Sequence, residues 1–284
     1  MSLDLVDVSF VYDVGTPFER MALDGVSFSI EPGSFVGIAG SSGSGKTTLV
    51  KILKGLLKPS SGQVSLGPFC NVGLVFQYPE FQLFESTVLK DVMFGPVNMG
   101  FEAEAAKCMA IEALASLGLD SSFWGRDPLA LSGGEKRRVA MAGVLSMNPH
   151  VLVLDEPAAG LDPTMHDLVF SLLLDLNRAG KTIVLVSHSM DDIAQYCNHV
   201  VYLKDGHVVA DGTPSYVFSN SEALDACISK PSMASLANDL RNAGLPIPSG
   251  ICTIDGLEKG LEELFCCDRC TKDNKRVPKG QLKP

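Results

Sequence analysis

Short apolar runs, each about as long as a β-strand, recur along the chain. They lie at residues 34–39 (SFVGIA), 151–156 (VLVLDE) and 181–188 (KTIVLVSH). Continuous apolar runs of this length are typical of strands buried on both faces of a parallel sheet. Between the last two runs, LVFSLLLDLNRAG has helical periodicity and ends at a glycine. The alternation of strand and helix predicts an α/β fold with a largely parallel sheet.

Other segments alternate apolar and polar positions with a period of two. Residues 3–10 and 23–30 show this pattern, which is typical of antiparallel strands. Residues 200–212 (VVYLKDGHVVADG) carry Asp205-Gly206 between two such runs, the strongest short-range signal of a hairpin. We therefore expect an antiparallel β-subdomain beside the parallel core sheet.

Residues 85–147 read as mostly helical, with a stripe of Ala, Met and Leu along FEAEAAKCMAIEALASLG. Further helices are predicted at 232–243 and 255–265. Beyond Phe265 the tail is polar and basic, and we expect it to be solvated. We predict one large domain at 1–225, with a helical subdomain at about 85–147, and a helical assembly or dimerisation extension at 226–284.

Composition narrows the class of protein. Hydrophobic residues make up 46%, enough for a sizeable core, and 23 Lys+Arg against 33 Asp+Glu give a net charge of −10. An acidic chain lacks the basic field that nucleic acid requires, so we expect no nucleic-acid partner. The longest apolar runs fall far short of the ~18 residues of a membrane span, and the N-terminus has no basic region of a signal peptide. Cys267 and Cys270 have the spacing of half a zinc site, but no second pair completes it.

The strand at 34–39 leads into GSSGSGKT at 40–47 and then into a helical pattern whose segment ends at Pro59 and Gly62. Strand, glycine-rich loop and helix stand in the order of a phosphate-binding loop, or P-loop. Its glycines let backbone N–H groups approach phosphate oxygens at the positive end of the helix. Lys46 adds a charge, and Thr47 offers a hydroxyl to Mg²⁺. The expected nucleotide ligands here are Gly40, Ser41, Ser42, Gly43, Ser44, Gly45, Lys46, Thr47 and Thr48.

Two adjacent carboxylates follow the apolar run VLVL. Asp155 and Glu156 emerge at the carboxyl edge of the sheet, where α/β folds bind their ligands. Asp155 is suited to hold the Mg²⁺ shell. Glu156, one residue further, can polarise an attacking water as a general base. Together with the P-loop, this pair predicts a nucleoside triphosphatase.

LSGGE at 131–135 is a second phosphate-binding signal. Ser132 and Glu135 form a capping-box pattern that opens the helix KRRVAMAGVLSM. Gly133 and Gly134 leave the first N–H groups of that helix uncovered, which makes it an anion site. One chain thus carries two helix starts suited to phosphate.

At this point the sequence closely resembles the ATP-binding cassette (ABC) ATPases, whose P-loop, LSGG signature, Asp-Glu pair and D-loop (AGLD, 159–162) stand here in the family order. The resemblance implies that Gln77 touches Mg²⁺ and the attacking water, that His188 contacts the γ-phosphate and that Tyr12 stacks on adenine. It assigns catalysis to Glu156, His188, Gln77 and Lys46, and the Mg²⁺ ligands to Thr47, Gln77 and Asp155. It also implies that two cassettes pair head to tail, so that Ser132, Gly133, Gly134 and Glu135 bind ATP held by a partner.

Within that family, residues 76–100 resemble the energy-coupling factor (ECF) ATPases of vitamin and cobalt uptake. Their pattern, near F-Q-Y-P-E-x-Q-L-F and then D-V-x-F-G-P-x-N, is almost complete here, with Phe81 where a His is common. Ala158, where many cassettes have Thr, is a second departure. The N- and C-terminal segments are most similar to the second ATPase type of this family. The resemblance implies a second, identical or related ATPase, a transmembrane coupling protein docked at 79–87 and a small membrane substrate-binding protein, on the cytoplasmic side of the cell membrane.

Two alternatives stay open on sequence alone. An ordinary ABC importer ATPase would share every phosphate motif, and the YPEFQLF segment is what speaks against it. A cassette that acts as a switch on DNA or ribosomes would carry a long coiled coil or a second cassette with basic linkers. The acidic charge and the single cassette disfavour that second alternative.

Overall fold

The computed structural model describes the backbone of residues 3–67, 71–219 and 230–272, and the side chains of these residues except 219 and 265–272. Contacts divide the chain into two units: Met1–His188 with Tyr196–Thr213, and Ser189–Gln195 with Pro214–Pro284. The predicted boundary at 225/226 lies outside the described residues.

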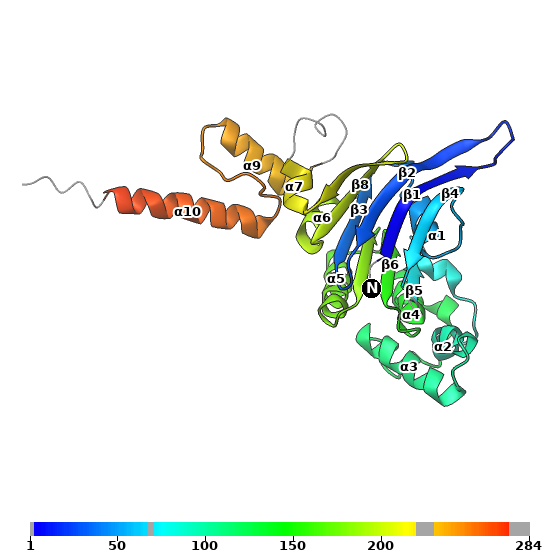
Figure 1. Ribbon diagram of the computed structural model, residues 1–284. Coiled ribbons are helices and arrows are strands. Elements are labelled where there is room, and N and C mark those ends of the chain that lie inside the picture. The colour runs from blue at the N-terminus through cyan, green and yellow to red at the C-terminus, as the bar shows by residue number, and fades with distance from the viewer. Residues whose placement is uncertain (1–2, 68–70, 220–229, 273–284) are drawn as a thin grey trace, which may run out of the picture. The chain divides into compact units, whose positions relative to one another are not determined.

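A six-stranded sheet forms the centre of the first unit, in the order β5-β6-β7-β3-β8-β9 (Figure 1). All neighbouring strands pair in parallel except β9, which is antiparallel to β8. Asp205 and Gly206 both adopt positive φ between these two strands, as the hairpin signal predicts. The largely parallel α/β sheet is confirmed. The strands are β3 Phe35–Gly40, β5 Val72–Val75, β6 Val151–Asp155, β7 Thr182–Val186, β8 His199–Lys204 and β9 His207–Gly212.

A second, antiparallel sheet has the order β2-β1-β4 and consists of β1 Leu3–Tyr12, β2 Arg20–Ile30 and β4 Ser61–Leu66. The helix α1 (Lys46–Leu53) packs between the two sheets, because its buried face shares one apolar cluster with β1, β2 and alternate residues of the core strands. This helix ends well before Pro59. Gly55 adopts φ 79° just after it, and Leu56 is exposed, so a left-handed glycine ends the helix earlier than the apolar pattern indicates.

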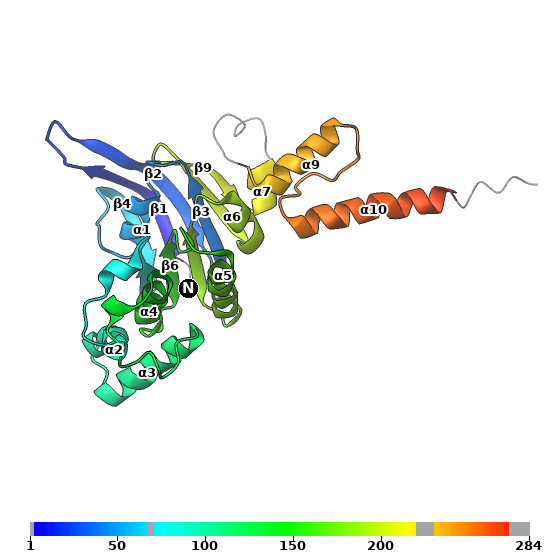
Figure 2. The ribbon, with the colours of Figure 1, turned by 180° about the vertical axis from the view of Figure 1, so that it is seen from behind.

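The opposite face of the core sheet is covered by α5 (Pro163–Arg178), which packs against β7. Residues 79–145 form a group of helices that contact one another and lie together in both views (Figures 1 and 2). They are η1 Pro79–Gln82, α2 Val88–Asn98, α3 Ala103–Ser116, η2 Pro128–Ala130 and α4 Gly133–Leu145. The predicted helical segment is therefore present, and α4 joins it to the sheet through contacts with β5.

The second unit has a small core of its own around Ala237, Ile247 and Leu257. Its described helices are α7 Pro214–Ser219, α9 Ser232–Asn242 and α10 Ile254–Lys272, and α6 Met190–Tyr196 belongs to it except for Tyr196. The backbone of α10 continues beyond the predicted end at 265, although the side chains of the CCDRC segment and the basic tail after Lys272 lie outside the described residues. No helix in the described ranges is long and apolar enough to cross a membrane.

Candidate functional site

Four strand ends meet at the carboxyl edge of the core sheet and carry most of the predicted site. The P-loop follows β3, Gln77 follows β5, Asp155 ends β6 and His188 follows β7. In the sheet register Asp155 lies opposite Val186, and Val186 lies opposite Ile38 of β3. Parallel pairing thus brings segments that are distant in the chain to one edge, where α/β folds bind ligands.

The P-loop requires glycine for steric reasons. Gly40, Gly43 and Gly45 have φ of 147°, 79° and 103°, values that only glycine adopts readily. A Cβ at Gly45 would lie 2.5 Å from the carbonyl oxygen of Ala22. Gly45 is the N-cap of α1 and supplies no side-chain cap, so the first N–H groups of this helix remain available to an anion.

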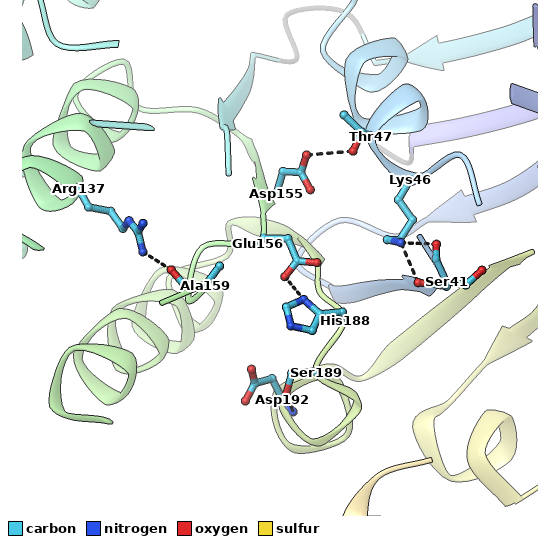
Figure 3. A network of polar contacts seen from close by, with 11 residues as sticks. Ser41, Lys46, Thr47, Arg137, Asp155, Glu156, Ala159, His188, Ser189 and Asp192 are labelled. Carbon is cyan, nitrogen blue, oxygen red and sulfur yellow. Dashed lines mark hydrogen bonds and ion pairs between the residues drawn. The ribbon is translucent and has the colours of Figure 1, made fainter. Parts of the chain in front are cut away.

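Lys46 lies across the inner side of this loop (Figure 3). Its Nζ donates to the carbonyl oxygens of Gly40 at 2.7 Å and Ser41 at 2.8 Å. Burial lowers the pKa of Lys46, while the nearby carboxylates Glu156 and Asp155 act to raise it. The buried hydroxyl of Ser44 has no hydrogen-bond partner among the described residues. A cation, free helix N–H groups and a buried unpaired hydroxyl together suit a polyphosphate.

The hydroxyl of Thr47, which follows Lys46, and the carboxylate of Asp155 lie within hydrogen-bonding distance of each other. Thr47 Oγ1 lies 3.4 Å from Asp155 Oδ2, and Asp155 is only 6% exposed. Burial raises the pKa of Asp155, and the neighbouring carboxylate of Glu156 raises it further. An exposed hydroxyl beside a buried carboxylate, next to a phosphate loop, offers the oxygen ligands that Mg²⁺ prefers, so these residues fit that ion.

Glu156 and His188 are joined by a hydrogen bond of 2.6 Å between Oε2 and Nδ1. The Glu156 side chain is 12% exposed and that of His188 is 74% exposed. Glu156 adopts φ 54°, unusual for a residue with a Cβ, and its N–H donates to the carbonyl oxygen of Val186 at 2.9 Å. This strained backbone directs the carboxylate away from Asp155 and towards His188.

Tyr12 lies at the end of β1, beside the start of α1. Its hydroxyl lies 3.2 Å from the hydroxyl of Thr48, and its ring meets Phe10 edge-on at 4.8 Å. Gln77 is exposed and lies two residues after the end of β5, whose last residue, Val75, pairs with Leu154 of β6. Adenine stacking by Tyr12 and Mg²⁺ contact by Gln77 stay predictions.

LSGGE lies at the start of α4, within the group of helices. Ser132 is the N-cap, its backbone N–H donates to Glu135 Oε2 at 2.8 Å, and its hydroxyl accepts from the backbone N–H of Glu135, which completes a capping box. The hydrogen bonds from Ser132 lower the pKa of Glu135. A Cβ at Gly133 or Gly134 would meet nothing within 4 Å, so this helix start is open on its outer side.

One group of polar residues was missed by sequence reasoning. Arg137 of α4 contacts Glu80 of η1. It also donates to the carbonyl oxygen of Ala159, three residues after Glu156 (Figure 3). Glu80 lies within YPEFQLF, but no pattern in the sequence relates it to residues 57 positions away.

The fold and the residues at the carboxyl edge of the core sheet define a P-loop nucleotide-binding cassette. It has a largely parallel core sheet, a smaller antiparallel sheet and a helical segment inserted between β5 and β6. The ABC transporter family model matches residues 23–159. Over 273 residues the chain is 43% identical to an energy-coupling factor transporter ATP-binding protein, EcfA2, of Lactobacillus johnsonii, covering 90% of this chain and 94% of that one. The EcfA2 of Clostridioides difficile is 44% identical over 282 residues, covering 93% and 97%.

Solved structures of ABC ATPases are similar to this chain as well. CbiO1 of Clostridium perfringens, described as part of the ABC transporter complex cbiONQ, matches with a TM-score of 0.68 and 36% identity over 79% of this chain and 93% of that one. The cassette MJ0796, solved as a dimer with ADP and Pi, matches with a TM-score of 0.67 and 32% identity over 75% and 98%. The chain belongs to the energy-coupling factor transporter ATP-binding proteins, ABC-type ATPases that bind ATP.

Proposed function

We propose that this chain hydrolyses ATP to power an ECF-type membrane transporter that imports a vitamin or a transition-metal ion. The observation that carries the proposal is the convergence of the P-loop, Asp155 and the Glu156–His188 pair at one sheet edge. The relatives named as energy-coupling factor transporter ATP-binding proteins, which align over nearly their whole length, supply the transport role.

Each residue at the edge has a task in this proposal. Lys46 and the N–H groups of the P-loop bind the β- and γ-phosphates, and Tyr12 stacks on the adenine. Glu156 accepts a proton from the attacking water, while His188 orients the carboxylate and reaches the γ-phosphate. Mg²⁺, held by Thr47, Asp155 and Gln77, would neutralise charge that develops on the phosphate oxygens.

The second cassette completes the site. Ser132, Gly133, Gly134 and Glu135 lie at the start of α4, a helix start with uncovered N–H groups. The phosphates bound in this chain's own P-loop already receive donors from the loop after β3 and from the start of α1, so the start of α4 is free to bind another nucleotide. In the proposal these residues bind ATP held by an identical or related cassette. ATP then closes the pair and hydrolysis releases it, a nucleotide-driven switch.

The membrane partners bind the helical side of the cassette. Phe81 and Phe84 are 83% and 60% exposed at η1 and just after it. A hollow of about 380 Å³ lies beside Phe84, and the residues that line it include Leu83, Phe84, Phe94, Met99 and Met147. We propose that helices of a transmembrane coupling protein dock here, and that this protein holds a small substrate-binding membrane protein. The chain is then peripheral, on the cytoplasmic face of the cell membrane.

The transport role is tested by purifying the tagged full chain from native membranes. We expect a second cassette and a multi-span protein to accompany it, together with a smaller membrane protein. Recovery with ribosomes or with DNA-repair proteins would overturn the transporter assignment. Recovery with a periplasmic-type importer complex would replace it by an ordinary ABC importer.

The hydrolytic role is tested by Glu156→Gln, which keeps the side-chain shape and removes the base. We expect turnover of Mg-ATP to fall by at least about 100-fold, because a general base contributes on that scale. ATP binding remains, so light scattering should detect an accumulated ATP-bound dimer. Retained turnover in this variant would exclude Glu156 as the base.

A further inference from the structure

Arg137 is a buried cation that joins three parts of the cassette. It lies in α4, is 8% exposed, and uses all three nitrogens of its guanidinium. Nε and Nη2 lie 3.5 and 3.3 Å from the two carboxylate oxygens of Glu80, and Nη1 donates to the carbonyl oxygen of Ala159 at 2.6 Å. The planar fork of arginine can make these contacts at once, whereas the single ammonium of lysine cannot.

One end of this connection is the surface that we assign to the membrane partner. Glu80 lies within η1, and its side chain is 18% exposed. The next residue, Phe81, is among the most exposed apolar side chains of the described chain. A displacement of η1 therefore moves the carboxylate that faces Arg137.

The other end is the turn that carries the proposed base. The N–H of Ala159 donates to the carbonyl oxygen of Glu156 at 3.2 Å, so Arg137 holds the closing residue of a tight turn (Figure 3). Glu156 begins this turn in a strained conformation, with φ 54°. Such a conformation persists only where surrounding contacts determine it.

A purely stabilising role does not account for this arrangement. Burying a guanidinium and a carboxylate costs desolvation that their attraction offsets only in part. An apolar pair would hold α4 against η1 without that cost. Unlike an apolar pair, the arginine makes hydrogen bonds of fixed geometry at both ends: to Glu80 on the docking surface and to Ala159 on the catalytic turn.

We propose that Arg137 is a positioning residue that links η1 to the turn at Ala159 and so sets the place of the Glu156 carboxylate according to what is docked on η1. The inference rests on the proposed function, because it takes Glu156 as the base and η1 as part of the docking surface. The link itself is a physical contact that can be tested without either assumption.

The link is tested on the full chain by hydrogen exchange at the backbone amides of residues 157–161. We expect Arg137→Gln to speed exchange there about tenfold, since the turn loses a charged donor. Glu80→Gln leaves Arg137 in place and should speed exchange about threefold. Arg138→Gln is the matched control, because it removes the same charge one residue further along α4, where Nη1 donates to Leu117 instead. Wild-type exchange at 157–161 in both Glu80→Gln and Arg137→Gln would overturn the proposal.

The positioning role is tested by separating kcat from KM for ATP. Arg137→Gln should lower kcat about tenfold and leave KM unchanged, because it displaces the base and not the P-loop. Arg137→Lys keeps the charge and should not restore kcat. Full rescue by lysine, or an equal change in KM, would show that charge or general stability is what matters and would overturn the proposal. If the variants change amide exchange as expected but the wild-type chain hydrolyses no ATP, the link between η1 and the turn stands and the proposed function is overturned.

Discussion

Asp155 and Glu156 are neighbours in the chain, and their side chains face different surroundings. Asp155 ends β6 in regular extended backbone and faces Thr47 beneath the P-loop. Glu156 turns through φ 54° and faces His188. One unusual residue conformation therefore separates the carboxylate that we propose to hold Mg²⁺ from the carboxylate that we propose to act on water.

The buried charge of Asp155 lowers the stability of the chain without nucleotide. Folding raises its pKa, first through burial and then through the charge of Glu156, so ionisation costs more in the folded chain than in the unfolded chain. The cost is present at pH values above the raised pKa. It shrinks as pH falls through that pKa and is gone below the pKa of the unfolded chain.

We therefore predict that Asp155→Asn raises the unfolding temperature of the nucleotide-free, Mg²⁺-free chain by about 2 °C at pH 7. The gain should shrink as the pH falls through the raised pKa of Asp155, and the variant should lose the stabilisation by Mg-ATP. Differential scanning calorimetry measures both. Asp167→Asn is the control, because the Asp167 side chain is 80% exposed and its removal should change little. A lower unfolding temperature in Asp155→Asn would contradict the prediction.

At the scale of elements, two helix starts carry residues that we propose to bind phosphate, and local sequence encodes both starts. α4 begins with a capping box and α1 begins at a left-handed glycine, and both features follow from residue types within a few positions. β4 is different: its residues are mostly exposed and polar, and it forms because β1 offers an edge to pair with. No pattern within the segment predicts such a strand.

The start of α4 allows a test that separates folding from pairing. A Cβ added at Gly134 would meet open space, and acidic residues in the first turn of a helix are favourable. Gly134→Asp should therefore keep the unfolding temperature within about 2 °C. It places a negative charge where the partner's phosphates would lie, so ATP-dependent pairing should be lost.

Light scattering with ATP, in the Glu156→Gln background that accumulates the ATP-bound form, measures this pairing. Gly134→Ala is the matched control: it adds the Cβ without the charge and should still pair. If Gly134→Asp pairs as well as Gly134→Ala does, the helix start is not a phosphate site in the dimer.

At the scale of the whole molecule, the chain combines a nucleotide-binding unit with a smaller helical unit that has its own core. Every residue that we propose to bind ATP or Mg²⁺ lies within Met1–His188 of the first unit. The smaller unit is thus available for another task, and we predict that it extends the contact between ATPases.

Deletion of residues 226–284 should leave ATP binding intact and weaken pairing. Light scattering over a range of protein concentrations, with ATP binding measured in parallel, tests both parts. Removal of residues 273–284 alone is the control, because it takes away the end of the chain after α10 and keeps α9 and α10. Unchanged dimerisation after the larger deletion would exclude an assembly role.

The sequence by itself determined the class of sheet, the hairpin at Asp205-Gly206, the P-loop and the capped start of α4. These features depend on periodicity, on the φ angles that glycine permits and on caps, all of which act over a few residues. Only the tertiary structure decided that Glu156 meets His188 across 32 positions, and that Arg137 joins Glu80, 57 positions away, to Ala159, 22 positions away. Such contacts depend on which strands lie side by side and on how helices pack against them. A pattern of apolar and polar positions encodes which face of an element is buried, but it does not encode which element packs against that face.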